Sequence, residues 1–91
     1  MDRKEHRDRV LTALNKHRQR ATYGAVGDLV GLPALSLMQG LTKGPQYSWV
    51  VSKSTGMPTG YAEAEIDSHL RLQSRVLKSR AELEEWLSRH D

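Results

Sequence analysis

The sequence predicts one α+β domain, because three patterns follow one another along the chain. Residues 23–30 form a short apolar helix, which Thr22 can cap and Gly31 can end. Pro33 suits the first position of a following short helix, since a proline there loses no hydrogen bond. Residues 48–52 are then rich in the β-branched and aromatic side chains typical of strands. This order predicts a winged helix-turn-helix: a three-helix core with a small antiparallel β-sheet and a C-terminal helix.

The N-terminal half contains two predicted helices before the turn. Apolar residues recur at helical spacing over residues 4–18, and residues 17–21 then read as a turn. The second helix includes Gly24 and Gly27, each of which costs about 1 kcal/mol relative to alanine. We therefore expect another backbone to pack closely against this helix.

The middle of the chain predicts the presented helix and the wing. A third helix is expected over residues 34–41, with Leu35, Met38 and Leu41 on one face. The Gly- and Pro-containing arm 53–60 is expected to lead into a second strand near Tyr61.

The C-terminal third is less regular at its start. Residues 62–73 leave one helical turn at 62–66 as an open alternative, and residues 74–78 predict a third strand. Ser79 and Glu82 form a capping box, after which Leu83, Trp86 and Leu87 provide the apolar face of a final helix.

Composition limits the classes of function. The 91 residues contain no cysteine, which excludes disulfides, thiolate metal sites and thiol nucleophiles. No apolar run approaches the roughly 18 residues of a membrane span, and the charged segment 1–5 does not suit a signal peptide. We expect a cytoplasmic chain without a membrane partner. The four histidines lie at no metal-ligand spacing, so we expect no metal and no cofactor.

Charge is distributed unevenly around the formal net charge of +3. Residues 1–20 carry seven basic and three acidic side chains, whereas residues 61–91 carry five basic and seven acidic ones. A basic N-terminal part favours a polyanionic partner. The alternative is that these cations only solvate a surface helix.

Four short motifs carry a resemblance to a known family. Thr-Tyr-Gly at 22–24, Gly-Leu-Pro at 31–33, Val-Val at 50–51 and Gly-Tyr at 60–61 resemble the DNA-binding domain of the alkylguanine-DNA alkyltransferases, also called methylated-DNA–protein cysteine methyltransferases. They also resemble the non-enzymatic alkyltransferase-like proteins. The resemblance covers about residues 6–61 of the single domain 1–91 and leaves 62–91 as a divergent C-terminal extension.

The departures from that family bear on chemistry. Tyr47 stands where the alkyl-accepting cysteine belongs, with Ser48 at the histidine position and Trp49 at the arginine position. Alkyl transfer needs a thiolate, so the sequence predicts a protein that is not an enzyme. The arginine that fills the space left by a flipped base is also missing, since Ser36 or Leu37 occupies its position.

The predicted function is non-catalytic binding of duplex DNA, mainly through phosphates, with residues 33–41 at the major or minor groove. The candidate DNA-binding residues are Arg18, Arg20, Tyr23, Ser36, Gln39, Lys43 and Lys53, and the possible pocket residues are Tyr47, Trp49 and Tyr61. For each, a plain structural or surface role is the alternative; Trp49 in particular suits a core anchor. Two other functions stay open: a sensor of alkylated guanine in DNA repair, and a protein-interaction module with a partner on the C-terminal helix or the Leu35 face.

Overall fold

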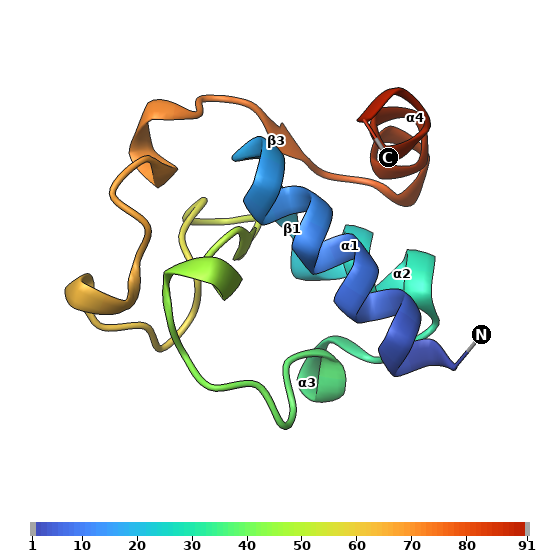
Figure 1. The fold of residues 1–91 in the computed structure, drawn as a ribbon, viewed down its shortest axis with the longest axis horizontal. Helices are drawn as coiled ribbons and strands as arrows, with labels where there is room; N and C mark the ends of the chain where they lie inside the picture. The colour runs from blue at the N-terminus through green and yellow to red at the C-terminus, as the bar shows by residue number, and fades with distance from the viewer. Residues whose placement is uncertain (1, 91) are drawn as a thin grey trace.

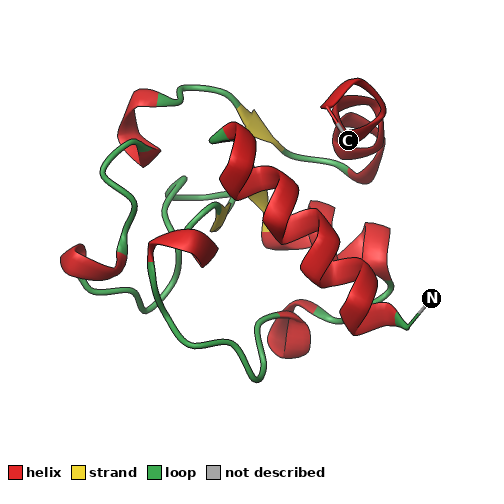
Figure 2. Cartoon of the chain, in the orientation of Figure 1, coloured by secondary structure: helices red, strands yellow, loops and turns green. Residues whose placement is uncertain are grey.

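The structure, a computed structural model, describes residues 2–90. Helices dominate the ribbon, and the strands are short (Figures 1 and 2). The α-helices are α1 (Arg3–His17), α2 (Tyr23–Val30), α3 (Ala34–Leu37) and α4 (Arg80–His90). The strands are β1 (Arg20–Thr22), β2 (Val50–Val51) and β3 (Val76–Leu77), and the 3-10 turns are η1 (Pro45–Tyr47), η2 (Glu63–Glu65) and η3 (Leu70–Leu72).

The sheet corrects the predicted fold class. Its order is β2-β1-β3 and both pairings are parallel, with Ala21 opposite Val50 on one side and Leu77 on the other. The chain is therefore an α/β arrangement, and the predicted winged helix-turn-helix with an antiparallel sheet is wrong. The error began at β1, because residues 17–21 were expected to form a turn. Parallel neighbours also need long crossover connections, which strand propensity alone does not reveal.

The first two helices are confirmed: α1 covers Arg3–His17 where 4–18 is predicted, and α2 has the predicted cap and end. Arg18 ends α1 in the left-handed conformation at φ 53°. Thr22 caps α2 by accepting a hydrogen bond from Ala25 N at 3.1 Å, and Gly31 ends it at φ 77°. The close packing expected of the helix glycines is present at Gly27, where a Cβ would lie 2.7 Å from the Leu32 carbonyl oxygen. It is absent at Gly24, whose Cβ would meet nothing nearer than 4.0 Å.

The third helix is shorter than the predicted 34–41, since α3 ends at Leu37. Beyond it the backbone continues in tight turns, and Gly40 takes a positive φ of 80° that a right-handed helix does not allow. Pro33 lies just before the helix, at the cap, and not at its first position. Leu37 is buried, whereas Leu35 is 98% exposed.

The second strand expected near Tyr61 is also wrong. Among the described residues, 52–75 contain turns, η2 and η3 but no strand. The open alternative of a helical turn at 62–66 corresponds to η2. These residues have little strand character, so no extended pairing partner forms for β2 on this side.

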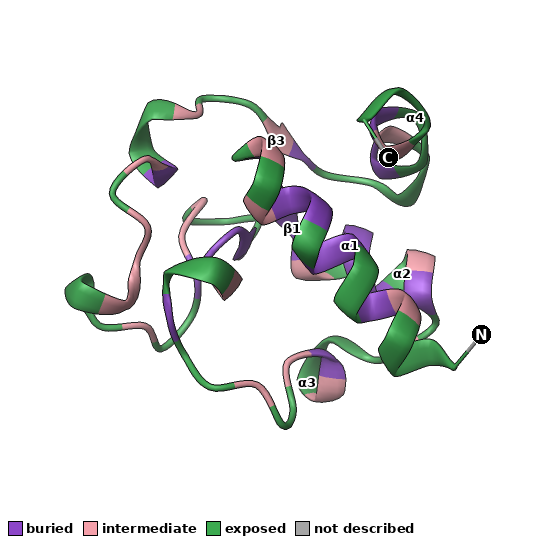
Figure 3. Ribbon diagram, in the orientation of Figure 1, coloured by how far each residue is buried: buried purple, intermediate pink, exposed green. Residues whose placement is uncertain are grey.

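The C-terminal segment belongs to the same core as the rest of the chain. β3 lies within the predicted third strand, and the Ser79 hydroxyl caps α4 by accepting from Glu82 N at 3.2 Å. Leu77, Leu83 and Trp86 are buried in one cluster with the apolar residues of α1, α2 and β2. Figure 3 shows this buried colour gathered where these elements meet, and green dominating the long loops. No helix within residues 2–90 has the length and apolar character needed to cross a membrane.

Candidate nucleic-acid interface

A groove of about 350 Å³ opens beside α3, between the start of α2 and the loop that precedes η2. Its lining residues are Tyr23, Ala34, Leu35, Met38, Leu41, Lys43, Thr59 and Tyr61. Most of these side chains are apolar or aromatic, one is a cation, and none is acidic. The surface formed by residues 33–43 together with this groove is called the α3 face below.

Three hydrogen bonds fix the far wall of the groove. Tyr23 Oη accepts from Thr59 N at 2.9 Å, and Lys43 Nζ donates to the Gly60 carbonyl at 2.7 Å. Tyr61 Oη donates to the Tyr47 carbonyl at 3.4 Å. Burial, reinforced by Tyr23, Glu65 and Tyr47, raises the pKa of Tyr61 to about 12. The Tyr61 hydroxyl is therefore a neutral donor at physiological pH.

Arg7 holds the side of the groove that residues 34–41 form. Its Nη1 donates to the carbonyls of Leu37 and Gln39, both at 3.0 Å, and its Nη2 pairs with Asp8 at 2.9 Å. The side chain is only 5% exposed. Sequence reasoning missed this residue. The available signal was its spacing, since Arg7 falls on the helix face that Val10, Leu11 and Leu14 define.

The structure brings part of the predicted site together. Tyr23, Lys43 and Tyr61 all line the groove, although they come from three separate segments. Gln39 is exposed on the same segment as α3, and Ser36 is half-buried, with its hydroxyl 3.4 Å from the Pro33 carbonyl.

Three predicted cations lie elsewhere. Arg20 donates to the carbonyls of Gly56, at 2.8 Å, and Gln73, so its guanidinium joins two loops to β1. Burial lowers the pKa of Arg20, and within residues 2–90 its Nε has no hydrogen-bond partner. Lys53 is exposed in the turn after β2, and Arg18 is exposed at the C-terminal end of α1.

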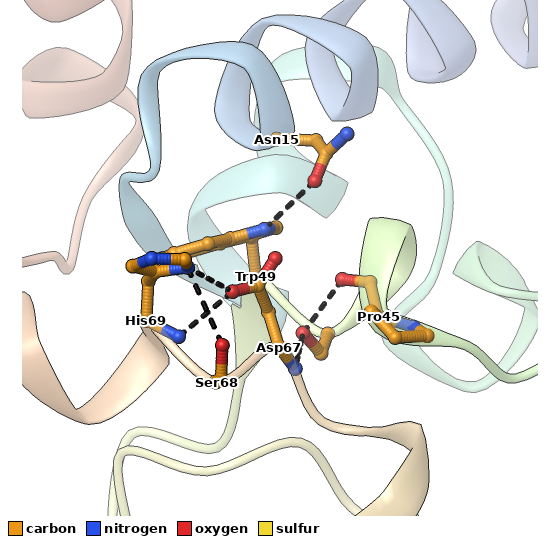
Figure 4. A network of polar contacts seen from close by, with 7 residues as sticks. Asn15, Pro45, Trp49, Asp67, Ser68 and His69 are labelled. Atoms are coloured by element: carbon orange, nitrogen blue, oxygen red, sulfur yellow. Dashed lines mark hydrogen bonds and ion pairs between the residues drawn. The ribbon is translucent and has the colours of Figure 1, made fainter.

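Trp49 and Tyr47 do not line the groove with Tyr61. Trp49 is 1% exposed and donates from Nε1 to Asn15 Oδ1 at 3.0 Å, as Figure 4 shows. It is a core anchor with a satisfied indole N–H. Tyr47 is half-buried, and its carbonyl accepts the hydrogen bond from Tyr61.

An Asp-His pair lies below Trp49 in Figure 4 and has the residue types of a hydrolase triad. His69 Nδ1 is 3.0 Å from Asp67 Oδ1 and 3.5 Å from the Ser68 hydroxyl. A triad needs its serine and its carboxylate on opposite ring nitrogens, whereas here both approach Nδ1. The backbone N–H of His69 also bonds Asp67 and is the main cause of the lowered pKa of that carboxyl. The pair therefore closes a loop and does not activate a nucleophile.

Comparison with known proteins adds no family to this description. No family model, no curated protein and no solved structure matches the chain. Within residues 2–90, no three His, Asp or Glu side chains lie close enough together to hold a metal ion.

Proposed function

We propose that the chain is a non-catalytic duplex DNA-binding protein that contacts the duplex with its α3 face, mainly through phosphates. The observation that carries the proposal is the presentation of residues 33–41 at the surface, with Leu35 98% exposed, beside a groove without acidic lining. A segment sealed in the core or surrounded by carboxylates could not approach a polyanion.

Cations at both ends of the presented segment support this ligand. A Cβ placed on Gly31 would lie 3.3 Å from Arg3 Nε, so the Arg3 side chain covers the start of the segment. Lys43 is exposed at its other end and uses one of its three N–H groups on Gly60. Arg3 and Lys43 can therefore each reach a phosphate, one at either end of the presented segment.

The resemblance of the motifs at 22–24, 31–33, 50–51 and 60–61 to alkyltransferase-like proteins supports the same ligand class. The Tyr23 hydroxyl accepts from Thr59 N and keeps its own proton for a phosphate oxygen. Without a cysteine, the chain has no thiolate to accept an alkyl group, so we propose binding without catalysis.

The test is a fluorescence-anisotropy titration of a short duplex across a series of salt concentrations. Log affinity should fall with log salt by about 0.9 for each phosphate neutralised. The variant K43Q should lower this slope by about 0.9, whereas K78Q removes an exposed lysine near α4 and should leave it unchanged. Absence of binding at low salt, a salt-independent affinity or equal effects of the two substitutions would refute the proposal.

A second candidate is a sensor of alkylated guanine. The groove favours it, because about 350 Å³ lies within the size range of small-ligand pockets and two tyrosines and Met38 line it. An extruded base must recover an unstacking cost of a few kcal/mol in such a pocket. Competition between alkylated and unmodified duplexes decides this candidate, and equal affinities would exclude it.

A third candidate is a protein-interaction module, which the exposed Leu35 beside an apolar groove favours. Charge argues for DNA over this function, because Arg3 and Lys43 flank the segment. The C-terminal helix offers less to a partner, since Leu83 and Trp86 of α4 are already buried within the chain.

A further inference from the structure

Two neighbouring hollows lie beside α1 and its C-terminal end, away from the α3 face. The first, of about 320 Å³, is lined by Asp8, Arg9, Thr12, Ala13, Lys16, His17 and His90. The second, of about 180 Å³, is lined by His17, Arg18, His69, Leu72 and Gln73. His17 lines both, so the two hollows are neighbours, and together they are called the α1 track below.

The α1 track is cationic. Arg9, Lys16 and Arg18 are exposed, and none of them forms an ion pair with another residue of the described chain. Asp8, the carboxylate among the residues lining the track, pairs with Arg7 at 2.9 Å, and the neighbouring Asp67 pairs with His69 at 3.0 Å. Within residues 2–90 these three cations therefore have no ion-pair partner, and Asp67, whose pKa Arg18 helps to lower, is already bonded to His69.

Aromatic packing holds two of the three histidines of the track, His17 and His90, in place. The His90 ring stacks on Trp86 with centroids 4.7 Å apart, and the His17 ring meets the same indole edge-on at 5.7 Å. His90 Nδ1 lies 2.9 Å from the Trp86 carbonyl, which can only accept, so this nitrogen donates. Since Trp86 is 6% exposed, the two histidine rings pack against a residue of the core.

The track and the α3 face lie on opposite sides of α1. Arg7, which bonds α3, and Lys16 are nine residues apart, which is two and a half helical turns. Figure 1 accordingly shows α3 and α4 on either side of α1. Along the axis, Arg9 and Lys16 are separated by about 10 Å, a length over which a duplex presents about six phosphate charges.

We propose that the α1 track is a second binding surface for a duplex phosphate backbone, which lets one chain link two duplex segments. The proposal takes its ligand class from the proposed function but uses none of the α3-face residues. Charge complementarity commits it to phosphodiester backbone, because the residues lining the track include three exposed cations without an ion pair in the described chain but one exposed large apolar side chain, Leu72.

The test compares R9Q/K16Q/R18Q with K43Q and with the control K78Q/R80Q. All of these side chains are exposed, so thermal unfolding should show that each variant folds. Linking is measured by energy transfer between a donor-labelled and an acceptor-labelled duplex, and single-duplex affinity by anisotropy. In the triple variant, the linking measured by energy transfer should fall at least tenfold. Its salt slope should fall by about 0.9 for each phosphate that it no longer neutralises. The duplex binding that depends on Lys43 should remain.

The outcomes separate this inference from the proposed function. If K43Q weakens duplex binding but the triple variant links duplexes as well as wild type, the track inference is overturned and the α3 face stands. If the triple variant loses duplex binding and K43Q does not, the track stands and the proposed α3 interface fails. Track-dependent binding of phosphatidylserine vesicles, without any of duplex, would also overturn the inference.

Discussion

Replacing Arg7 by methionine should release the presented segment from α1, and the size of the effect can be worked out from the hydrogen bonds. Methionine keeps most of the aliphatic stem but removes both hydrogen bonds to the carbonyls of Leu37 and Gln39, together with the ion pair to the exposed Asp8. A buried acceptor left without a donor costs about 1–3 kcal/mol. The Leu37 carbonyl bears this cost in full, whereas the partly buried Gln39 carbonyl can turn to water. We therefore expect the free energy of unfolding to fall by about 2–3 kcal/mol.

The matched control is Arg9→Met in the same helix. Arg9 is exposed, so its substitution should change stability by no more than about 0.5 kcal/mol. Urea unfolding measures both variants, and amide hydrogen exchange measures where the effect lies. In R7M the amides of Ser36, Gln39 and Leu41, which close the turns of the segment, should lose more protection than those of α2.

Two results would refute this account of Arg7. One is a stability of R7M equal to that of R9M, which would mean that the two carbonyls gain nothing from the guanidinium. The other is an equal loss of protection throughout the chain, which would make Arg7 a general core residue and not the anchor of one segment. A fall in duplex affinity in R7M would act through the position of the α3 face, because a side chain that is 5% exposed cannot reach a phosphate.

The two other predictions concern α2 and the groove. Gly27→Ala should destabilise the chain by about 1–3 kcal/mol through contact with the Leu32 carbonyl, whereas Gly24→Ala should stabilise it by up to about 1 kcal/mol. Thermal unfolding measures both variants, and a change in stability of the same sign in both would contradict the packing. The pKa of Tyr61 is about 12 in the folded chain and about 10 in the unfolded chain. Its contribution to stability is complete below pH 10 and falls as pH rises toward 12. Tyr61→Phe should remove this fall in alkaline unfolding curves, and titration of all three tyrosinates together near pH 10 would contradict it.

The starts of α2 and α4 could be predicted because their causes lie within a few residues, whereas the end of α3 was predicted wrongly. Thr22 bonds a backbone N–H three residues ahead, and Ser79 does the same for Glu82. Both patterns are visible in a short window of sequence. The sheet could not be predicted in this way, because β1 is three residues long and its partners lie at residues 50–51 and 76–77. Nothing in the sequence around Ala21 indicates that it lies between two parallel neighbours.

In the candidate site, too, the type of residue could be predicted from local sequence, but its hydrogen-bond partners could not. Tyr23, Lys43 and Tyr61 could each be chosen from local motifs and charge, and they do line one groove. Arg20 looked equally suited to phosphate, yet its donors reach Gly56 and Gln73. The charge of an arginine is known from the sequence, but the carbonyls to which its guanidinium donates depend on which distant loops lie beside β1.

The presented segment owes its shape to α1 more than to its own sequence. A four-residue helix is far below the roughly 12–15 residues at which isolated helices become even marginal, so propensity cannot hold α3 in place. Burial of Leu37 and the hydrogen bonds from Arg7 do so instead. Since the opposite side of α1 carries the α1 track, one rigid helix sets the positions of both proposed surfaces. R7M should therefore weaken binding at the α3 face more than binding at the track, where Arg9, Lys16 and Arg18 remain and Asp8 loses its partner.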